Sequence, residues 1–169
     1  RATTTIPIVM MAVANPVASV TSVVLTGITH TWVGDLQIVL KDPSGTGYNL
    51  MVRPGFIGTG NGNAGDFLSP GQTITFVPAG GLPIPDGTNV NIPTGNYNQH
   101  YGFSAPWSSG NLGIYNINMR LLTGTAGTWS LVIYDWAPGD TGALTSWTLN
   151  GTDTAGVVTT FCEPGVSGV

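Results

Sequence analysis

The side chains in this sequence that are able to do acid–base chemistry are two histidines, His30 and His100, and a small set of acidic residues. Nucleophilic hydrolysis requires a serine, threonine or cysteine activated by a histidine that a carboxylate orients. The sequence contains no Gly-x-Ser-x-Gly motif of the kind that presents a nucleophilic serine. We therefore assign no catalytic residues and expect a protein that is not an enzyme.

Two aspartates, Asp135 and Asp140, bracket the turn Pro138–Gly142 and are candidates for a pair of carboxyl groups. A glycosidase needs two carboxyl groups at a defined separation, one of them with a raised pKa. Capping of the turn explains the same two residues without any chemistry, because aspartate accepts hydrogen bonds from nearby backbone amides. We favour the turn-capping interpretation.

Calcium binding is the other chemistry that these carboxylates offer. Ca²⁺ takes six to eight oxygen ligands, which carboxylates and loop carbonyls supply. The first candidates are Asp135, Asp140 and Asp66, and further candidates are Asp35 and Asp42; all lie at predicted strand ends or in glycine-rich loops. The alternative, that these side chains only cap turns, stays open. The glycine-rich loop Gly58–Gly65 lacks a Gly-Lys-Ser/Thr ending, so we expect a flexible loop and no phosphate site.

The elements that must position these residues are β-strands. Residues 35–41 alternate apolar and polar side chains, with Leu36, Ile38 and Leu40 on one face, and turn residues stand on both sides. No stretch has helical periodicity. We predict an all-β protein, an antiparallel β-sandwich of jelly-roll type with about eight strands and two long loops, 54–71 and 78–113. The predicted strands are 6–14, 19–31, 35–41, 48–53, 72–77, 114–122, 128–135 and 144–151.

Two blocks of sequence resemble a known family. "ITHTWVGDLQIVLKDPSGT" and "GTAGTWSLVIYDWAPGDTGALTSWTL" are similar to the P domain, or P/Homo B domain, of proprotein convertases and bacterial secreted proteins. The resemblance implies a β-sandwich that accompanies a secreted subtilisin-like protease, a structural role for His30 beside its turn, and calcium binding in some bacterial members. The acidic Phe-Asp-Asp motif of the family is replaced here by Thr75-Phe76-Val77-Pro78.

Composition limits the partners. Charged residues make up 7% of the chain and the formal net charge is −4, with no basic cluster, so we do not expect a nucleic-acid partner. No run of about 18 apolar residues is present, so we expect no membrane span. A surface of threonine, asparagine and glycine fits an exported, extracellular protein at a cell surface that is tethered or assembled.

The start of the chain offers a route to assembly. Ile6, Ile8, Val9, Met10, Met11 and Val13 form a strongly apolar strand within residues 1–14. That strand either packs in its own sandwich or completes the sheet of a neighbour, which would make a filament. The predicted partner is thus another copy of the chain or a linked protein domain. We expect one P-domain-like sandwich over residues 1–152 and a linker or tail over 153–169, with the single cysteine, Cys162, unpaired within the chain.

The aromatic residues of the second long loop, Tyr97, Tyr101, Phe103 and Trp107, admit two interpretations. Exposed aromatic rings form platforms for carbohydrates or protein partners. Buried rings fix a long loop to its own sandwich, and we favour that interpretation. Two functions remain: a structural, self-associating subunit, or an accessory domain that stabilises a secreted protease.

Overall fold

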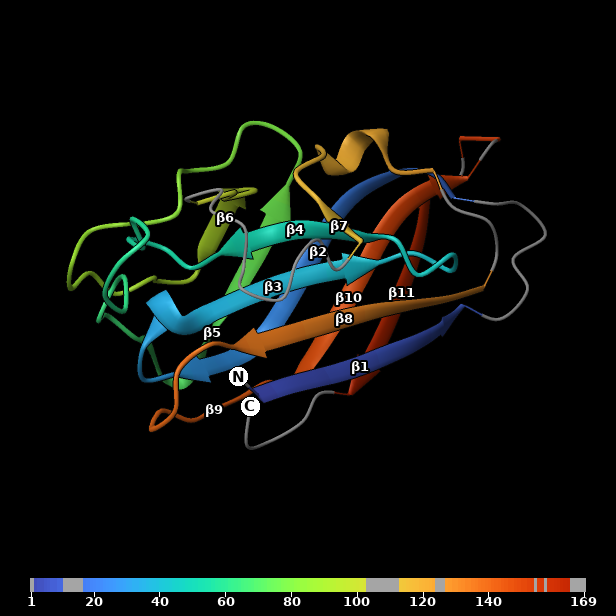
Figure 1. Ribbon diagram of the computed structural model, residues 1–169. Helices are drawn as coiled ribbons and strands as arrows, with labels where there is room; N and C mark the ends of the chain where they lie inside the picture. Colours follow the sequence, from blue (N-terminus) through green and yellow to red (C-terminus); the bar gives the residue numbers. More distant parts are fainter. Residues whose placement is uncertain are drawn as a thin grey trace.

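The computed structural model describes residues 2–10, 17–102, 113–123, 127–153, 155–156 and 158–164. In the first strand, in the last strand apart from Thr160, and at positions 17–18 and 69–70, it describes the backbone alone. Eleven strands form two sheets that face each other (Figure 1). The predicted all-β sandwich is therefore confirmed.

Sheet A contains five strands in the order β1-β8-β3-β4-β7. Their bounds are β1 Ala2–Met10, β8 Gly127–Asp135, β3 Leu36–Lys41, β4 Gly47–Val52 and β7 Ile114–Tyr115. Sheet B has the order β11-β10-β2-β5-β6, and a short strand, β9, also pairs with β2. Their bounds are β11 Val158–Pro164, β10 Ser146–Asp153, β2 Val17–His30, β5 Phe67–Val77, β6 Gly95–Asn98 and β9 Gly142–Ala143.

All ladders are antiparallel except two short ones at the same side of the sandwich. β7 pairs with β4 in parallel, and β6 pairs with β5 in parallel. At the opposite side β1 and β11 are the terminal strands of their sheets and approach each other (Figure 1). The two ends of the described chain thus supply the edges of both sheets on one side.

The core between the sheets contains the side chains that the alternation predicted. Leu36, Ile38 and Leu40 of β3 are buried, and the inward residues of the neighbouring strands pack against them. Those neighbours include Ile74, Phe76, Trp129, Leu131, Ile133, Trp147 and Leu149. The other face of sheet A is also covered in part, because Val39, Val132 and Tyr134 form a second buried cluster.

Several predicted elements differ in the structure. The first strand is β1, Ala2–Met10, where 6–14 was predicted; β5 begins at Phe67, inside the first predicted loop, and β6, Gly95–Asn98, lies inside the second. The strand expected at 114–122 consists only of β7, followed by a 3₁₀ turn, η2 Met119–Leu121, which Asn118 begins by accepting a hydrogen bond from the Arg120 amide. In this turn Met119 is buried while Leu121 is exposed, so the side chains do not alternate as in a strand.

The tail expected at 153–169 contains a strand. β11 pairs with β10 over seven residues, from Ser146 opposite Pro164 to Thr152 opposite Val158. The threonine- and glycine-rich composition of this segment is typical of a linker, and the prediction of a linker is wrong for Val158–Pro164.

Candidate functional site

The site is built around His30, the last residue of β2. Its side chain is 2% exposed, and Nδ1 lies 3.0 Å from the Trp32 carbonyl oxygen and 3.1 Å from the Trp32 amide nitrogen. Nδ1 therefore fixes the turn that leads from β2 to the 3₁₀ turn η1, Val33–Asp35. Whichever tautomer is present, the ring has one nitrogen engaged with the backbone two residues along the chain.

The second ring nitrogen of His30 faces a carboxylate. Nε2 is buried, has no hydrogen-bond partner among the described residues and lies 3.9 Å from Oδ2 of Asp135, the last residue of β8. That distance is too long for a hydrogen bond but short enough for an electrostatic interaction. Burial lowers the pKa of His30, while Asp135, Trp32, Asp140 and Asp66 act in the opposite direction. Burial is the larger effect, and the neutral ring is favoured.

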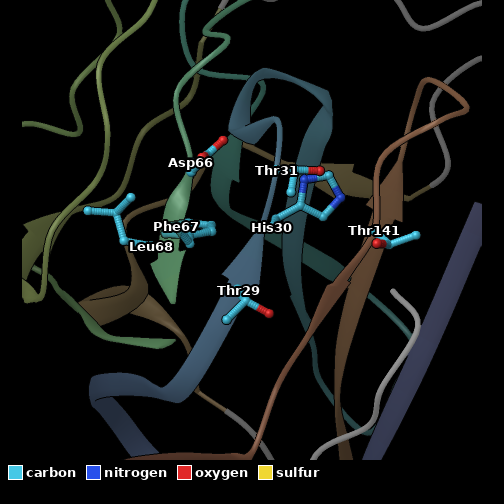
Figure 2. A pocket seen from close by; sticks show the side chains of 7 residues that line it. All are labelled: Thr29, His30, Thr31, Asp66, Phe67, Leu68 and Thr141. Carbon is cyan, nitrogen blue, oxygen red and sulfur yellow. The ribbon is translucent and has the colours of Figure 1, made fainter. Parts of the chain in front are cut away.

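A pocket of about 280 Å³ opens beside the His30 ring (Figure 2). Its lining comes from the end of β2, the start of β5 and the turn before β9, and consists of Thr29, His30, Thr31, Asp66, Phe67, Leu68 and Thr141. Glycine is required where β9 closes on β2. A Cβ atom at Gly142 would lie 2.1 Å from the Thr29 carbonyl oxygen and 2.9 Å from Cδ2 of His30.

Asp35, the last residue of η1, forms a second buried interaction. Its carboxylate lies 3.4 Å from Nη2 of Arg53, and Nε of Arg53 donates to the Gly34 carbonyl at 2.9 Å. Burial nevertheless raises the pKa of Asp35 to about 6, because it outweighs the opposing charge of Arg53. Arg53, which has a left-handed backbone (φ 34°), also stacks over Phe56 at 3.9 Å. No local pattern in the sequence marks Arg53, since its partner is 18 residues away.

The predicted calcium ligands fall into two groups. Asp66, Asp135 and Asp140 all lie near enough to His30 to affect its pKa. Asp140 accepts a hydrogen bond from the Thr31 hydroxyl at 2.8 Å, and Asp135 accepts one from the Ala137 amide at 3.2 Å. Asp42 lies apart from them.

Asp42 caps the turn after β3. It accepts hydrogen bonds from the Ser44 amide and hydroxyl, the Thr46 amide and the Tyr48 hydroxyl. In the part of the chain that the structure describes, no three His, Cys, Asp or Glu side chains surround one point at metal-binding distance. In the structure several of these carboxylates accept hydrogen bonds at turns, and three influence the pKa of His30. Calcium binding stays a prediction.

The glycine-rich loop before β5 is anchored by an asparagine. Asn63 is fully buried; its Oδ1 accepts from the amides of Gly65 and Val90, and its Nδ2 donates to the carbonyls of Pro85 and Val90. The Ala64 amide also donates to the Thr88 carbonyl, so the loop that the sequence predicted to be flexible is joined to the second long loop by side-chain and backbone hydrogen bonds.

Of the aromatic residues of the second predicted loop, Tyr97 is an anchor, while Tyr101 is only half-buried. Tyr97 is 2% exposed and donates its hydroxyl to the Pro93 carbonyl at 2.8 Å. Phe103 and Trp107 lie outside the described residues. The remaining histidine, His100, lines a separate pocket with Phe56, Ile57 and Asp86.

The residues proposed for assembly lie in the first strand. Ile6, Ile8, Val9 and Met10 belong to β1, which pairs with β8 of the same chain over all nine of its residues. Met11 and Val13 lie outside the described residues. No helix in the described ranges is long and apolar enough to cross a membrane.

Comparisons with known proteins give little beyond this geometry. No protein-family profile matches the sequence, and no curated protein matches it significantly. Among solved structures, the chain is similar to a serine protease of Aeromonas sobria, with a TM-score of 0.31, 16% identity and coverage of 98% of this chain. It is also similar to the same protease in complex with the chaperone ORF2, with a TM-score of 0.31, 17% identity and 98% coverage. The chain spans 21% of the length of these proteins. At this TM-score neither match supports an argument about function, which therefore has to be made from the chain itself.

Proposed function

We propose that this protein is a non-catalytic, extracellular β-sandwich with a structural role, and that it associates with copies of itself by exchange of β1. The observation that carries the proposal is the position of β1. It is the first strand of the chain, it occupies the edge of sheet A, and β8 is its only partner strand among the described residues.

Exchange of such a strand conserves its contacts. A β1 supplied by a neighbour would form the same nine pairs with Gly127–Asp135. Because each chain would donate one strand and receive another, the contact is head-to-tail and does not close on itself, so it produces a filament. With 7% charged residues, the chain has little electrostatic repulsion to oppose such association.

Removal of the strand tests this proposal. A variant lacking residues 1–14 is expected to form no filaments, because β8 then has no donated strand to receive. A synthetic peptide of residues 1–14 should bind the truncated protein and raise its melting temperature. Particle size by light scattering and negative-stain microscopy, with and without the peptide, gives the readout. Filaments or other particles larger than a dimer, formed by the truncated chain alone, would contradict strand exchange.

The second candidate is an accessory domain of a secreted subtilisin-like protease. The resemblance of its two sequence blocks to P domains favours it, and so does their position in space. His30 and Asp35 come from the first block, and the charges of Asp135 and Asp140 from the second block act on both of them. An accessory domain would remain monomeric with β1 in its own sheet, so a monomer at all protein concentrations favours this candidate.

Calcium binding is a separate proposal that applies to either function. Asp66, Asp135 and Asp140 would be the ligands, assisted by loop carbonyls and water. Addition of EDTA to protein prepared with calcium is then expected to lower the melting temperature, and Asp140→Asn should reduce the effect. An unchanged melting curve with EDTA would exclude a structural calcium ion.

A further inference from the structure

The described part of the sandwich has four sheet edges, and two of them are covered by loop backbone or are very short. Beside β4, the His100 amide donates to the Leu50 carbonyl and the Val52 amide donates to the His100 carbonyl, each at 2.9 Å. Beside β6, Leu82 forms two backbone hydrogen bonds with Asn96 and Asn98. β7 itself has two residues. Short or covered edges are how natural sheets avoid pairing with other chains.

The edge formed by β1 is interrupted by a proline. The Trp136 amide donates to the Asp35 carbonyl, so the backbone N–H and C=O groups of residue 136 point toward the β3 side of β8. In a strand the backbone groups of every second residue point to the same neighbour, so those of Ser130 also point toward β3 and away from β1. Its partner Pro7 therefore turns its nitrogen outward, at the middle of the outer edge of β1. A proline there has no N–H to donate, and the edge accepts no regular neighbouring strand.

Within the described ranges, no loop backbone is hydrogen-bonded along the outer edge of β11 as it is beside β4 and β6, although β1 of the other sheet approaches it. Among the described residues β11 is the terminal strand of sheet B, and its sequence Val-Thr-Thr-Phe-Cys-Glu-Pro has proline only at its last position. It contains no lysine or arginine, and Glu163 is its only charged residue. Because β1 is blocked by Pro7, a contact between β11 of one copy and β1 of another is disfavoured, and β11 is left to pair with its own kind.

We infer that β11 pairs antiparallel with β11 of a second copy across a two-fold axis at Phe161, which joins sheet B of the two copies into one sheet. Phe161 is the middle residue of Val158–Pro164, and centring the axis there makes all seven residues overlap. In this register Thr160 lies opposite Cys162 of the second copy. Glu163 lies opposite Thr159 of the second copy, so the two carboxylates do not oppose each other. The contact is isologous and closes as a dimer.

A cysteine cross-link tests both the dimer and its register. Directly opposed residues of antiparallel strands have Cα atoms about 4.5–5.5 Å apart, a separation that a disulfide bridges. Thr160→Cys places a second thiol opposite Cys162 of the other copy. Thr160 is exposed and its one described contact is a hydrogen bond to Asn150, so the substitution should leave the fold intact. Thr159→Cys is the matched control, because its partner would be Glu163.

Full-length protein with each substitution would be oxidised mildly and run on a non-reducing gel. We expect a covalent dimer for Thr160→Cys, little for Thr159→Cys, and a non-covalent dimer of the natural chain by light scattering. A monomeric natural chain, no cross-link at position 160, or equal cross-linking of both variants would each overturn the inference. The inference is independent of β1 exchange: dimers without larger particles would contradict only the proposed filament, and filaments without the cross-link would contradict only β11 pairing.

Discussion

Asp35 and His30 are the two residues at which burial and charge oppose each other most clearly. Both side chains are at most 2% exposed, and both lie beside charged partners. Burial raises the pKa of Asp35 to about 6 and lowers the pKa of His30, so in each case the equilibrium moves toward the neutral form relative to the unfolded chain. The two groups act on stability in opposite directions as the pH changes.

The sign for Asp35 follows from its raised pKa. The folded chain binds the proton more tightly than the unfolded chain, whose aspartate has a pKa of 3.8. The free energy of unfolding therefore falls as the pH rises from about 4 to about 6, by up to about 3 kcal/mol. Asp35→Asn is expected to lack this fall. His30, with its lowered pKa, stabilises above pH 6.5 and loses that contribution as the pH falls, in both proteins alike.

Urea unfolding of the natural chain and of Asp35→Asn at several pH values between 4 and 7 measures the difference. Asp86→Asn, at an exposed position, serves as the control and should follow the natural chain. If the free energy of unfolding changes with pH in the same way for the natural chain and for Asp35→Asn, ionisation of Asp35 does not destabilise the folded protein.

At the scale of residues, the sequence indicates which side chains are candidates for a site, but not which side chains or backbone groups they contact. Sequence reasoning placed Asp66, Asp135 and Asp140 together as candidate ligands, and the fold does bring them around one histidine. It missed Arg53 and Asn63, because a buried arginine or asparagine looks like any surface polar residue until its distant partners are known. Asn63 bonds to Val90, 27 residues away, and no local pattern encodes that contact.

At the scale of elements, β8 is the strand on which sheet A depends. It lies between β1 and β3, and its Leu131 is fully buried against the core. Leu131→Ala is expected to lower the free energy of unfolding by about 2–5 kcal/mol, because it removes buried methyl groups and leaves a cavity. Leu121→Ala is the matched control, since Leu121 is 64% exposed in η2, and it should change stability by less than about 0.5 kcal/mol.

Chemical denaturation of the two variants gives this comparison directly. If Leu131→Ala and Leu121→Ala lower the free energy of unfolding equally, Leu131 does not lie on the face of β8 that packs in the core. The same pair of leucines shows where alternation succeeds and where it fails. The period-two pattern predicted β8 correctly, but the same pattern around Leu121 belongs to a 3₁₀ turn, because Asn118 accepts from the backbone two residues later.

At the scale of the whole molecule, the sandwich is asymmetric. One side is closed by loop residues that hydrogen-bond along β4 and β6, while the other side is formed by the first and last strands of the described chain. The fold class was predictable because strand periodicity is a local property of the sequence. The order of the strands was not, since it depends on pairings between distant segments such as β2 with β10 and β3 with β8.

The pairing of β1 with β8 also determines the order of events during synthesis. Met10 pairs with Gly127, so β1 leaves the ribosome long before its partner exists. At about 5–20 residues per second, the delay is roughly 6 to 25 seconds. Throughout that interval an apolar strand is available to any completed chain nearby whose own edge is vacant. If β1 is exchanged between copies as proposed, the speed of translation sets how long a nascent chain on a polysome offers its first strand to a neighbour before β8 is made.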